Sequence, residues 1–238
     1  MTTHSPALHR TRPARTSSFA TFVRENGLSL TLAAMFLVST AAQIGFGLGA
    51  YNEERAHAGF DAVTLGTYLA SGHFLEAIFE NWESEFLQMG IFVVLSAKLF
   101  QKGSAESKSL DERNESDEDP RRHQNDAKAP WPVRRGGWVL ALYENSLAIA
   151  FVLLFAFSFV LHAVGGHLNV NEENLARGRA PVTFGEYWTS SQFWYESFQN
   201  WQSEFLAVLA IVVLTIFLRQ RGSPQSKPVA APHEETGV

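Results

Sequence analysis

The chain contains no cysteine among its 238 residues, which excludes disulfides, catalytic thiolates and cysteine-ligated zinc or iron–sulfur sites. Its lysine and arginine residues form no basic groove with interleaved aromatic side chains, which argues against a nucleic-acid partner. Phosphate-loop, dinucleotide-binding, nucleophile-elbow and zinc-protease motifs are also missing. We therefore expect no nucleic acid, no cofactor and no enzymatic activity.

Long apolar blocks alternate with strongly polar ones, although the mean hydropathy of the whole chain is close to zero. The first apolar block, residues 28–50, follows an arm that carries several arginines. A cleaved signal peptide would have a shorter apolar core of roughly 7–15 residues. We interpret this block as a retained membrane span, because its counterpart lies in mid-chain where nothing can be cleaved.

The sequence repeats itself at a constant offset of 119 residues, which takes Thr64 to Thr183 and Tyr68 to Tyr187. Between residues 64–86 and residues 183–205, eleven of 23 positions are identical. Loop residues recur as well as apolar ones, and a shared helix period would not reproduce them. The chain is therefore interpreted as a tandem duplication.

Each half carries two predicted spans, since about 20 residues are enough to cross a bilayer as a helix. The predicted spans are residues 28–50, 82–100, 138–161 (with an extension to 168 left open) and 201–218. Two spans per half give both halves the same orientation, unlike the inverted repeats of many transporters. The predicted fold is an all-α integral membrane protein with four transmembrane helices in a tandem 2+2 parallel repeat.

Lysines and arginines flank the N-terminal arm, the central loop and the C-terminal tail, which places these three regions in the cytoplasm. The predicted location is the bacterial plasma membrane, with both termini cytoplasmic. The predicted divisions are an arm at 1–23, a first repeat at 24–102, a charged linker at 103–135, a second repeat at 136–221 and a tail at 222–238.

The linker has almost no apolar residues, so we predict that it is disordered. Its charges could contact protein partners in the cytoplasm. The lipid bilayer is the other expected partner, and a homo-oligomer is compatible with the sequence.

The outer loops carry helix-start signals. Thr183-x-x-Glu186 is a capping box, and Thr64-x-x-Thr67 is a weaker copy. They predict short helices at 65–70 and 184–189, lying in the interface at the external face of the plasma membrane. Ser71 and Ser190 can then cap the long helices that follow.

Six polar residues are predicted to form a layer in the outer half of the bundle. Glu85 and Glu204 lie about 21–22 Å along their helices from the cytoplasmic ends, and Gln43 and His162 reach nearly the same depth. The candidate layer is Gln43, Asn81, Glu85, His162, Asn200 and Glu204. It would act either as hydrogen-bonded glue between helices or as a proton or cation site.

A metal site is not expected. His73, Glu76 and Glu80 have the helical spacing of cation ligands, but their repeat mates are Gln192, Tyr195 and Gln199. The constellation is therefore absent from the second half, and two or three spaced ligands alone are weak evidence.

Several segments together are similar to an uncharacterised bacterial family of small membrane proteins. They are residues 24–29, 80–88, 130–138, 199–206 and 219–224. That family is catalogued only as a domain of unknown function, so the resemblance implies a membrane location and supplies no site residues. The leading hypothesis is a non-enzymatic structural or partner-binding protein. The alternatives are a proton- or cation-conducting transporter that uses Glu85 and Glu204 and, third, an enzyme that acts on a lipid or envelope substrate at the external membrane interface.

Overall fold

A computed structural model describes residues 18–110 and 114–237 of the chain. Over these residues the backbone forms α-helices, short 3₁₀ helices and turns, with no β-strand. The predicted all-α class is thereby confirmed. The chain divides into two compact units, Met1–Ala62 and Val63–Val238. The divisions predicted from sequence stay predictions, and residues 1–17 of the arm and 111–113 of the linker lie outside the described residues.

The first unit contains one long helix, α1 (Ser18–His57). Its 40 residues extend about 60 Å, well beyond a hydrocarbon core of about 30 Å. The predicted span 28–50 lies inside it. In the last turn of the helix, the Arg55 Nε donates a hydrogen bond to the Asp61 carbonyl at 3.0 Å, and its guanidinium lies 5.5 Å from the centroid of the Phe60 ring.

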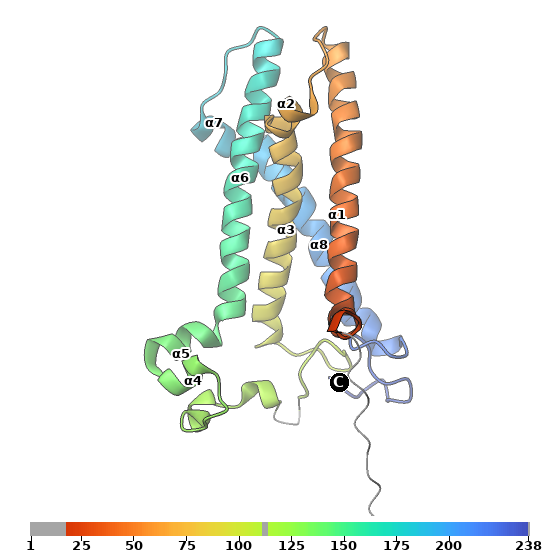
Figure 1. The fold of residues 1–238 in the computed structure, drawn as a ribbon, viewed down its shortest axis with the longest axis vertical. Helices are drawn as coiled ribbons and strands as arrows, with labels where there is room; N and C mark the ends of the chain where they lie inside the picture. The colour runs from red at the N-terminus through yellow and green to blue at the C-terminus, as the bar shows by residue number, and fades with distance from the viewer. Residues whose placement is uncertain (1–17, 111–113, 238) are drawn as a thin grey trace, which may run out of the picture. The chain divides into compact units, whose positions relative to one another are not determined.

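Three long helices form the second unit: α3 (Gly72–Ser96), α6 (Ser146–Ala176) and α8 (Ser191–Phe217). Helix α3 lies against both α6 and α8 (Figure 1). Glycines allow the closest approach between α3 and α6. A Cβ atom added at Gly165 would lie 2.5 Å from the Glu76 backbone nitrogen, and one added at Gly72 would collide with the Asn169 backbone.

Helices α3 and α8 are each capped as the sequence predicts. The hydroxyls of Ser71 and Ser190 accept hydrogen bonds from the third backbone N–H groups of α3 and α8. Before them lie the short helices α2 (Leu65–Leu69) and α7 (Phe184–Trp188), and α7 begins with a complete capping box. Both short helices occur where they were predicted, whereas their place at the membrane interface stays a prediction.

The described part of the linker contains three short elements, η1 (Glu115–Asp117), η2 (Pro120–His123) and α4 (Trp131–Arg135), and α5 (Gly137–Glu144) follows it. Gly136 turns the chain between α4 and α5 with a positive φ of 67°. The helix then breaks at Asn145, and α6 begins at Ser146. The predicted third span, 138–161, therefore covers parts of two helices, because Asn145 leaves the helical conformation between α5 and α6.

The segments that follow α3 and α8 share the same turn. The Ser107 hydroxyl accepts from the Gln101 backbone N–H at 2.9 Å, and the Ser226 hydroxyl accepts from the Gln220 N–H at 2.9 Å. The Lys227 ammonium is buried and donates to three tail carbonyls. These hydrogen bonds give each segment a folded conformation of its own.

Three helices of the described chain are long and apolar enough to cross a membrane. They are Phe19–His57, Ser146–Ala176 and Ser191–Phe217. Helix α3 has 25 residues but is not among the three, and it carries Glu76, Glu80, Glu83 and Glu85. The structure thus supports a membrane protein, and α3 is a long helix of the described chain that carries four glutamates.

Candidate functional site: a buried carboxylate–histidine cluster

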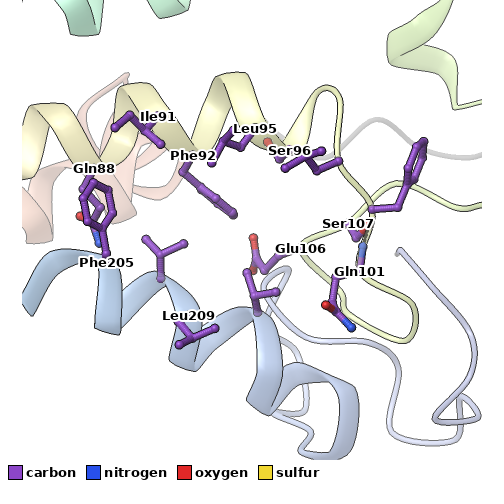
Figure 2. A pocket seen from close by; sticks show the side chains of 14 residues that line it. Gln88, Ile91, Phe92, Leu95, Ser96, Gln101, Glu106, Ser107, Phe205 and Leu209 are labelled. Carbon is purple, nitrogen blue, oxygen red and sulfur yellow. Dashed lines mark hydrogen bonds between the residues drawn. The ribbon is translucent and has the colours of Figure 1, made fainter. Parts of the chain in front are cut away.

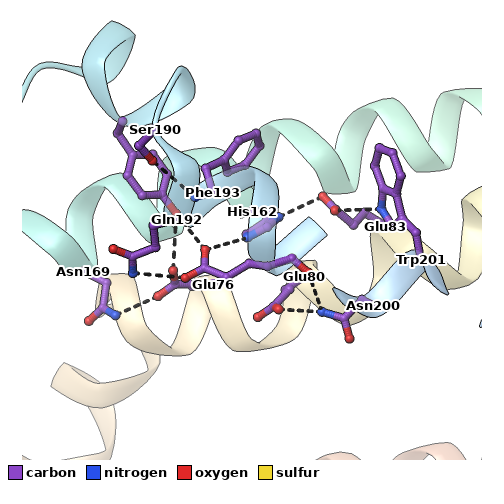
Figure 3. Close-up of polar contacts among 12 residues, drawn as sticks. Glu76, Glu80, Glu83, His162, Asn169, Ser190, Gln192, Phe193, Asn200 and Trp201 are labelled. Carbon is purple, nitrogen blue, oxygen red and sulfur yellow. Dashed lines mark hydrogen bonds and ion pairs between the residues drawn. The ribbon is translucent and has the colours of Figure 1, made fainter. Parts of the chain in front are cut away.

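Charged side chains gather where α3, α6 and α8 meet. Glu76, Glu80 and Glu83 follow one another at intervals of four and three residues, so one face of α3 presents all three. His162 of α6 and Glu196 of α8 complete the group (Figure 3). We call these five residues the carboxylate–histidine cluster.

His162 is the centre of the cluster and is fully buried. Its Nδ1 lies 2.9 Å from Glu83 Oε2, and the Glu83 side chain is also fully buried. The other Glu83 oxygen accepts a hydrogen bond from the Trp201 Nε1–H at 3.2 Å. Glu83 therefore has a partner for each oxygen, and it fixes the orientation of the imidazole ring.

Glu76 and Glu196 lie on the other side of the imidazole. Glu196 Oε2 is 3.8 Å from His162 Nε2. The Tyr187 hydroxyl lies 3.4 Å from Glu76 Oε1 and 3.3 Å from Glu196 Oε2. Burial and these two carboxylates raise the pKa of the Tyr187 hydroxyl, which keeps it protonated and able to donate.

Amide side chains donate hydrogen bonds to three of the carboxylates in the cluster. Asn169 Nδ2 donates to Glu76 Oε2 at 2.7 Å, and Gln192 Nε2 donates to Glu196 Oε1 at 3.0 Å. Asn200 Nδ2 makes a short hydrogen bond to Glu80 Oε1. Each carboxylate is thereby oriented by a neutral donor, which satisfies hydrogen bonds without supplying positive charge.

Aromatic rings close one side of the site. The buried Phe193 ring lies 5.0 Å from the His162 ring, centroid to centroid, and stacks on Trp188 at 5.2 Å. Phe159 packs against both of those aromatic side chains. Glu196 and Glu80 are partly exposed, and the Glu196 side chain is 20% exposed.

The cluster carries an excess of negative groups. Four glutamates surround one histidine, and within residues 18–110 and 114–237 the ion pairs of these glutamates involve His162 alone. Even a fully charged imidazolium would balance one carboxylate. The remaining groups require protons or a bound cation, because unpaired charges are costly in a low-dielectric interior.

The structure brings together only part of the predicted polar layer. His162 and Asn200 lie in the cluster. Asn81 and Glu85 are exposed, and the Asn81 amide donates to the Ala77 carbonyl of its own helix. Glu204 is half-buried and its backbone carbonyl accepts from Gln88.

Gln43, the remaining member of the predicted layer, lies on α1 in the first unit. Sequence reasoning missed Glu83, Glu196, Tyr187 and Trp201 as site residues. It considered Glu76 and Glu80 but paired them with His73, which lies on the same helix. A usable signal was available, since Glu76, Glu80 and Glu83 all occupy one stripe of α3 within a long helix.

A separate hollow lies between α3, α8 and residues 99–107 and encloses about 410 Å³ (Figure 2). Phe92, Leu95 and Leu209 are among the apolar side chains that line it. Glu106 turns into it, and burial raises the pKa of its carboxyl. The lining offers this one ionisable side chain, so the hollow is apolar in character and distinct from the cluster.

The chain matches a known protein family. The family described as a domain of unknown function, DUF6766, matches residues 19–238. The chain belongs to this family. No curated protein and no solved structure matches it. The resemblance drawn from the sequence is confirmed to this extent, and the function of this DUF6766 member has to be argued from the cluster itself.

Proposed function

We propose that this DUF6766 protein is a non-enzymatic membrane protein that carries protons or small cations through the carboxylate–histidine cluster. One observation carries the proposal: four glutamates share a single histidine where α3 meets α6 and α8, two helices that are long and apolar enough to cross a membrane. An ionised side chain at the centre of a bilayer costs about 3 kcal/mol on insertion scales. Three uncompensated charges would consume most of a stability of about 5–15 kcal/mol, so the cluster must take up positive charge.

Its position suits such a role. Glu83 lies 13 residues from Ser96, or roughly 20 Å along α3, which corresponds to the interior of a bilayer. Glu196 lies beside His162 and is partly exposed, so we assign it as the group that exchanges ions with water. Glu85 and Glu204, the carboxylates first predicted to carry ions, are outside the cluster in the described structure, and we do not retain them in that role.

We further propose that α3 is the fourth membrane span and that the two halves are parallel repeats in a bacterial plasma membrane. The matching serine caps of α3 and α8 and the matching turns after them support a duplication. The lysine and arginine distribution supports cytoplasmic termini. Reporter fusions at residue 115 should report a cytoplasmic location and those at residue 177 an external one. The opposite signals would overturn this topology.

A flux measurement tests the ion-carrying role. Purified protein is reconstituted into liposomes that contain a pH-sensitive dye, and proton entry is driven by a potassium diffusion potential. We expect flux above that of protein-free liposomes, and an at least tenfold loss in Glu76→Gln. Glu85→Gln is the matched control, because it removes the same charge from an exposed position of the same helix and should leave flux unchanged.

A purely structural role for the cluster predicts a different outcome. Wild-type liposomes would then show no more flux than protein-free ones, although the protein elutes as a folded species in detergent. Equal flux in wild type and Glu76→Gln would also refute the assignment of the cluster as the ion path. Partner binding by the linker and homo-oligomer formation stay predictions that a pull-down with residues 103–135 and a mass measurement in detergent can test.

A further inference from the structure

Three side chains of the cluster have the composition of a metal site. Glu76, His162 and Glu196 each offer a ligand atom, and these three atoms lie within 4.8 Å of one another. Two ligands bound about 2.1 Å from one metal ion and 3.8 Å apart subtend an angle of about 130° at it. The measured separation of His162 Nε2 and Glu196 Oε2 is 3.8 Å, so both atoms can bind one ion with little movement.

His162 supplies an independent sign that something binds here. The residue is fully buried, yet its Nε2 makes no hydrogen bond within the described chain. Its Nδ1 is occupied by Glu83. If Nδ1 carries the ring proton, the Nε2 lone pair points toward carboxylate oxygens. A lone pair facing carboxylates is unfavourable unless a cation lies between them.

Each of the three ligands is held by a hydrogen bond at its other polar atom (Figure 3). Glu83 holds the imidazole Nδ1, Asn169 holds Glu76 Oε2, and Gln192 holds Glu196 Oε1. Partners of this kind orient the ligands in metal sites, and a carboxylate on the distal nitrogen of a histidine is the commonest example. The remaining atoms, Glu76 Oε1, Glu196 Oε2 and His162 Nε2, face one another, and the Tyr187 hydroxyl bridges the two oxygens.

We propose that Glu76, His162 and Glu196 bind a divalent first-row transition-metal ion, with Zn²⁺ as the reference ion. One imidazole nitrogen with two carboxylates suits Zn²⁺, Mn²⁺ or Fe²⁺, whereas Ca²⁺ and Mg²⁺ prefer oxygen ligands alone. The absence of cysteine removes the thiolates that favour Cu⁺. A divalent ion would neutralise both carboxylates at once. The inference rests on the proposed function, because it names the class of cation that the cluster holds.

The test is metal binding to the full chain in detergent micelles. The protein is stripped with a chelator, dialysed and incubated with Zn²⁺, with Mg²⁺ in large excess as a competitor. Bound zinc is measured by elemental analysis, and its ligands by zinc-edge X-ray absorption. We expect one tightly bound Zn²⁺ per chain that Mg²⁺ does not displace, with one imidazole and otherwise oxygen ligands.

Two variants and a control test which carboxylates bind the zinc ion. Glu196→Gln changes the partly exposed ligand and should weaken zinc binding at least tenfold, and Glu76→Gln should do the same. Glu204→Gln, on the same helix as Glu196 but outside the cluster, should bind zinc like wild type. Equal zinc binding in wild type and Glu196→Gln, or a spectrum without an imidazole ligand, would overturn the proposal.

The metal assignment and the ion-carrying role can fail separately. Proton flux in chelator-treated liposomes without zinc binding would leave the proposed function standing and refute the metal site, with protons filling the gap between Nε2 and the carboxylates. Specific zinc binding without flux of protons or zinc would support the metal site and refute transport.

Discussion

The glycine at position 165 provides the sharpest test of how α3 and α6 meet. In Gly165→Ala the added Cβ would lie 2.5 Å from the Glu76 backbone nitrogen and 2.9 Å from the Leu75 carbonyl carbon. Ordinary contacts at such a Cβ begin near 3.4 Å. The two helices would therefore have to separate by about 1 Å, because helical backbone cannot shift locally as a flexible side chain can.

The expected cost follows from two opposing effects. Overpacking costs typically about 1–3 kcal/mol, and a clash with backbone belongs at the upper end of that range. Alanine is favoured over glycine inside a helix by about 1 kcal/mol, which offsets part of the loss. We expect the free energy of unfolding to fall by about 2 kcal/mol, and zinc affinity to fall with it because Glu76 moves away from His162.

The measurement is unfolding of the purified protein by sodium dodecyl sulfate in mixed micelles, followed by tryptophan fluorescence. Gly185→Ala is the control, since a Cβ atom at this helical position of α7 meets no atom within 4 Å. It should leave the unfolding free energy unchanged or raise it by up to about 1 kcal/mol. An unfolding free energy of Gly165→Ala equal to that of wild type would refute the close helix contact on which the cluster depends.

Two further predictions concern the cluster and the start of α7. Glu83→Ala removes the carboxylate that contacts His162 Nδ1 and should lower the free energy of unfolding by about 3–5 kcal/mol. Glu85→Ala, at an exposed position, should change it by less than about 0.5 kcal/mol. Equal effects of the two substitutions in the same unfolding assay would contradict the burial of Glu83 and His162. Hydrogen bonds from the backbone N–H and hydroxyl of Thr183 lower the pKa of the Glu186 carboxyl. The ionised Glu186 carboxylate therefore stabilises the folded chain at pH values above its pKa in the unfolded chain, and this stabilisation is lost as pH falls through its pKa in the folded chain. A carbon-detected NMR titration should show this lowered pKa rise part of the way to its ordinary range in Thr183→Ala, which removes the hydroxyl donor and keeps the backbone N–H, and an unchanged pKa would exclude the hydrogen bond from the hydroxyl.

Local features of the fold were predictable because their chemistry is local. The caps at Thr64, Ser71, Thr183 and Ser190 each need a hydroxyl and a backbone N–H three residues later, and the sequence contains both. The break at Asn145 was not predictable from hydropathy, since apolar residues continue on both sides of it. Apolar length alone does not reveal where one helix ends and another begins.

The site was harder to predict because depth along a helix does not give the direction of a side chain. Glu83 and Glu85 differ by two residues, which is about 3 Å of rise but about 200° of rotation. The first is fully buried and the second is exposed. Comparing repeat mates favoured the duplicated pair Glu85 and Glu204, while the cluster is built from residues that the two halves do not share.

That asymmetry is itself an argument about function. The repeat mates of Glu83 and His162 are Gln202 and Gln43, two neutral amides. Amides can form hydrogen bonds between membrane helices without the cost of burying charge. If the cluster served packing alone, amides at Glu83 and His162 would serve it equally well at a lower cost. Ionisable groups at these positions, whose carboxylates accept hydrogen bonds from neutral donors, are instead suited to the binding of a proton or a metal cation.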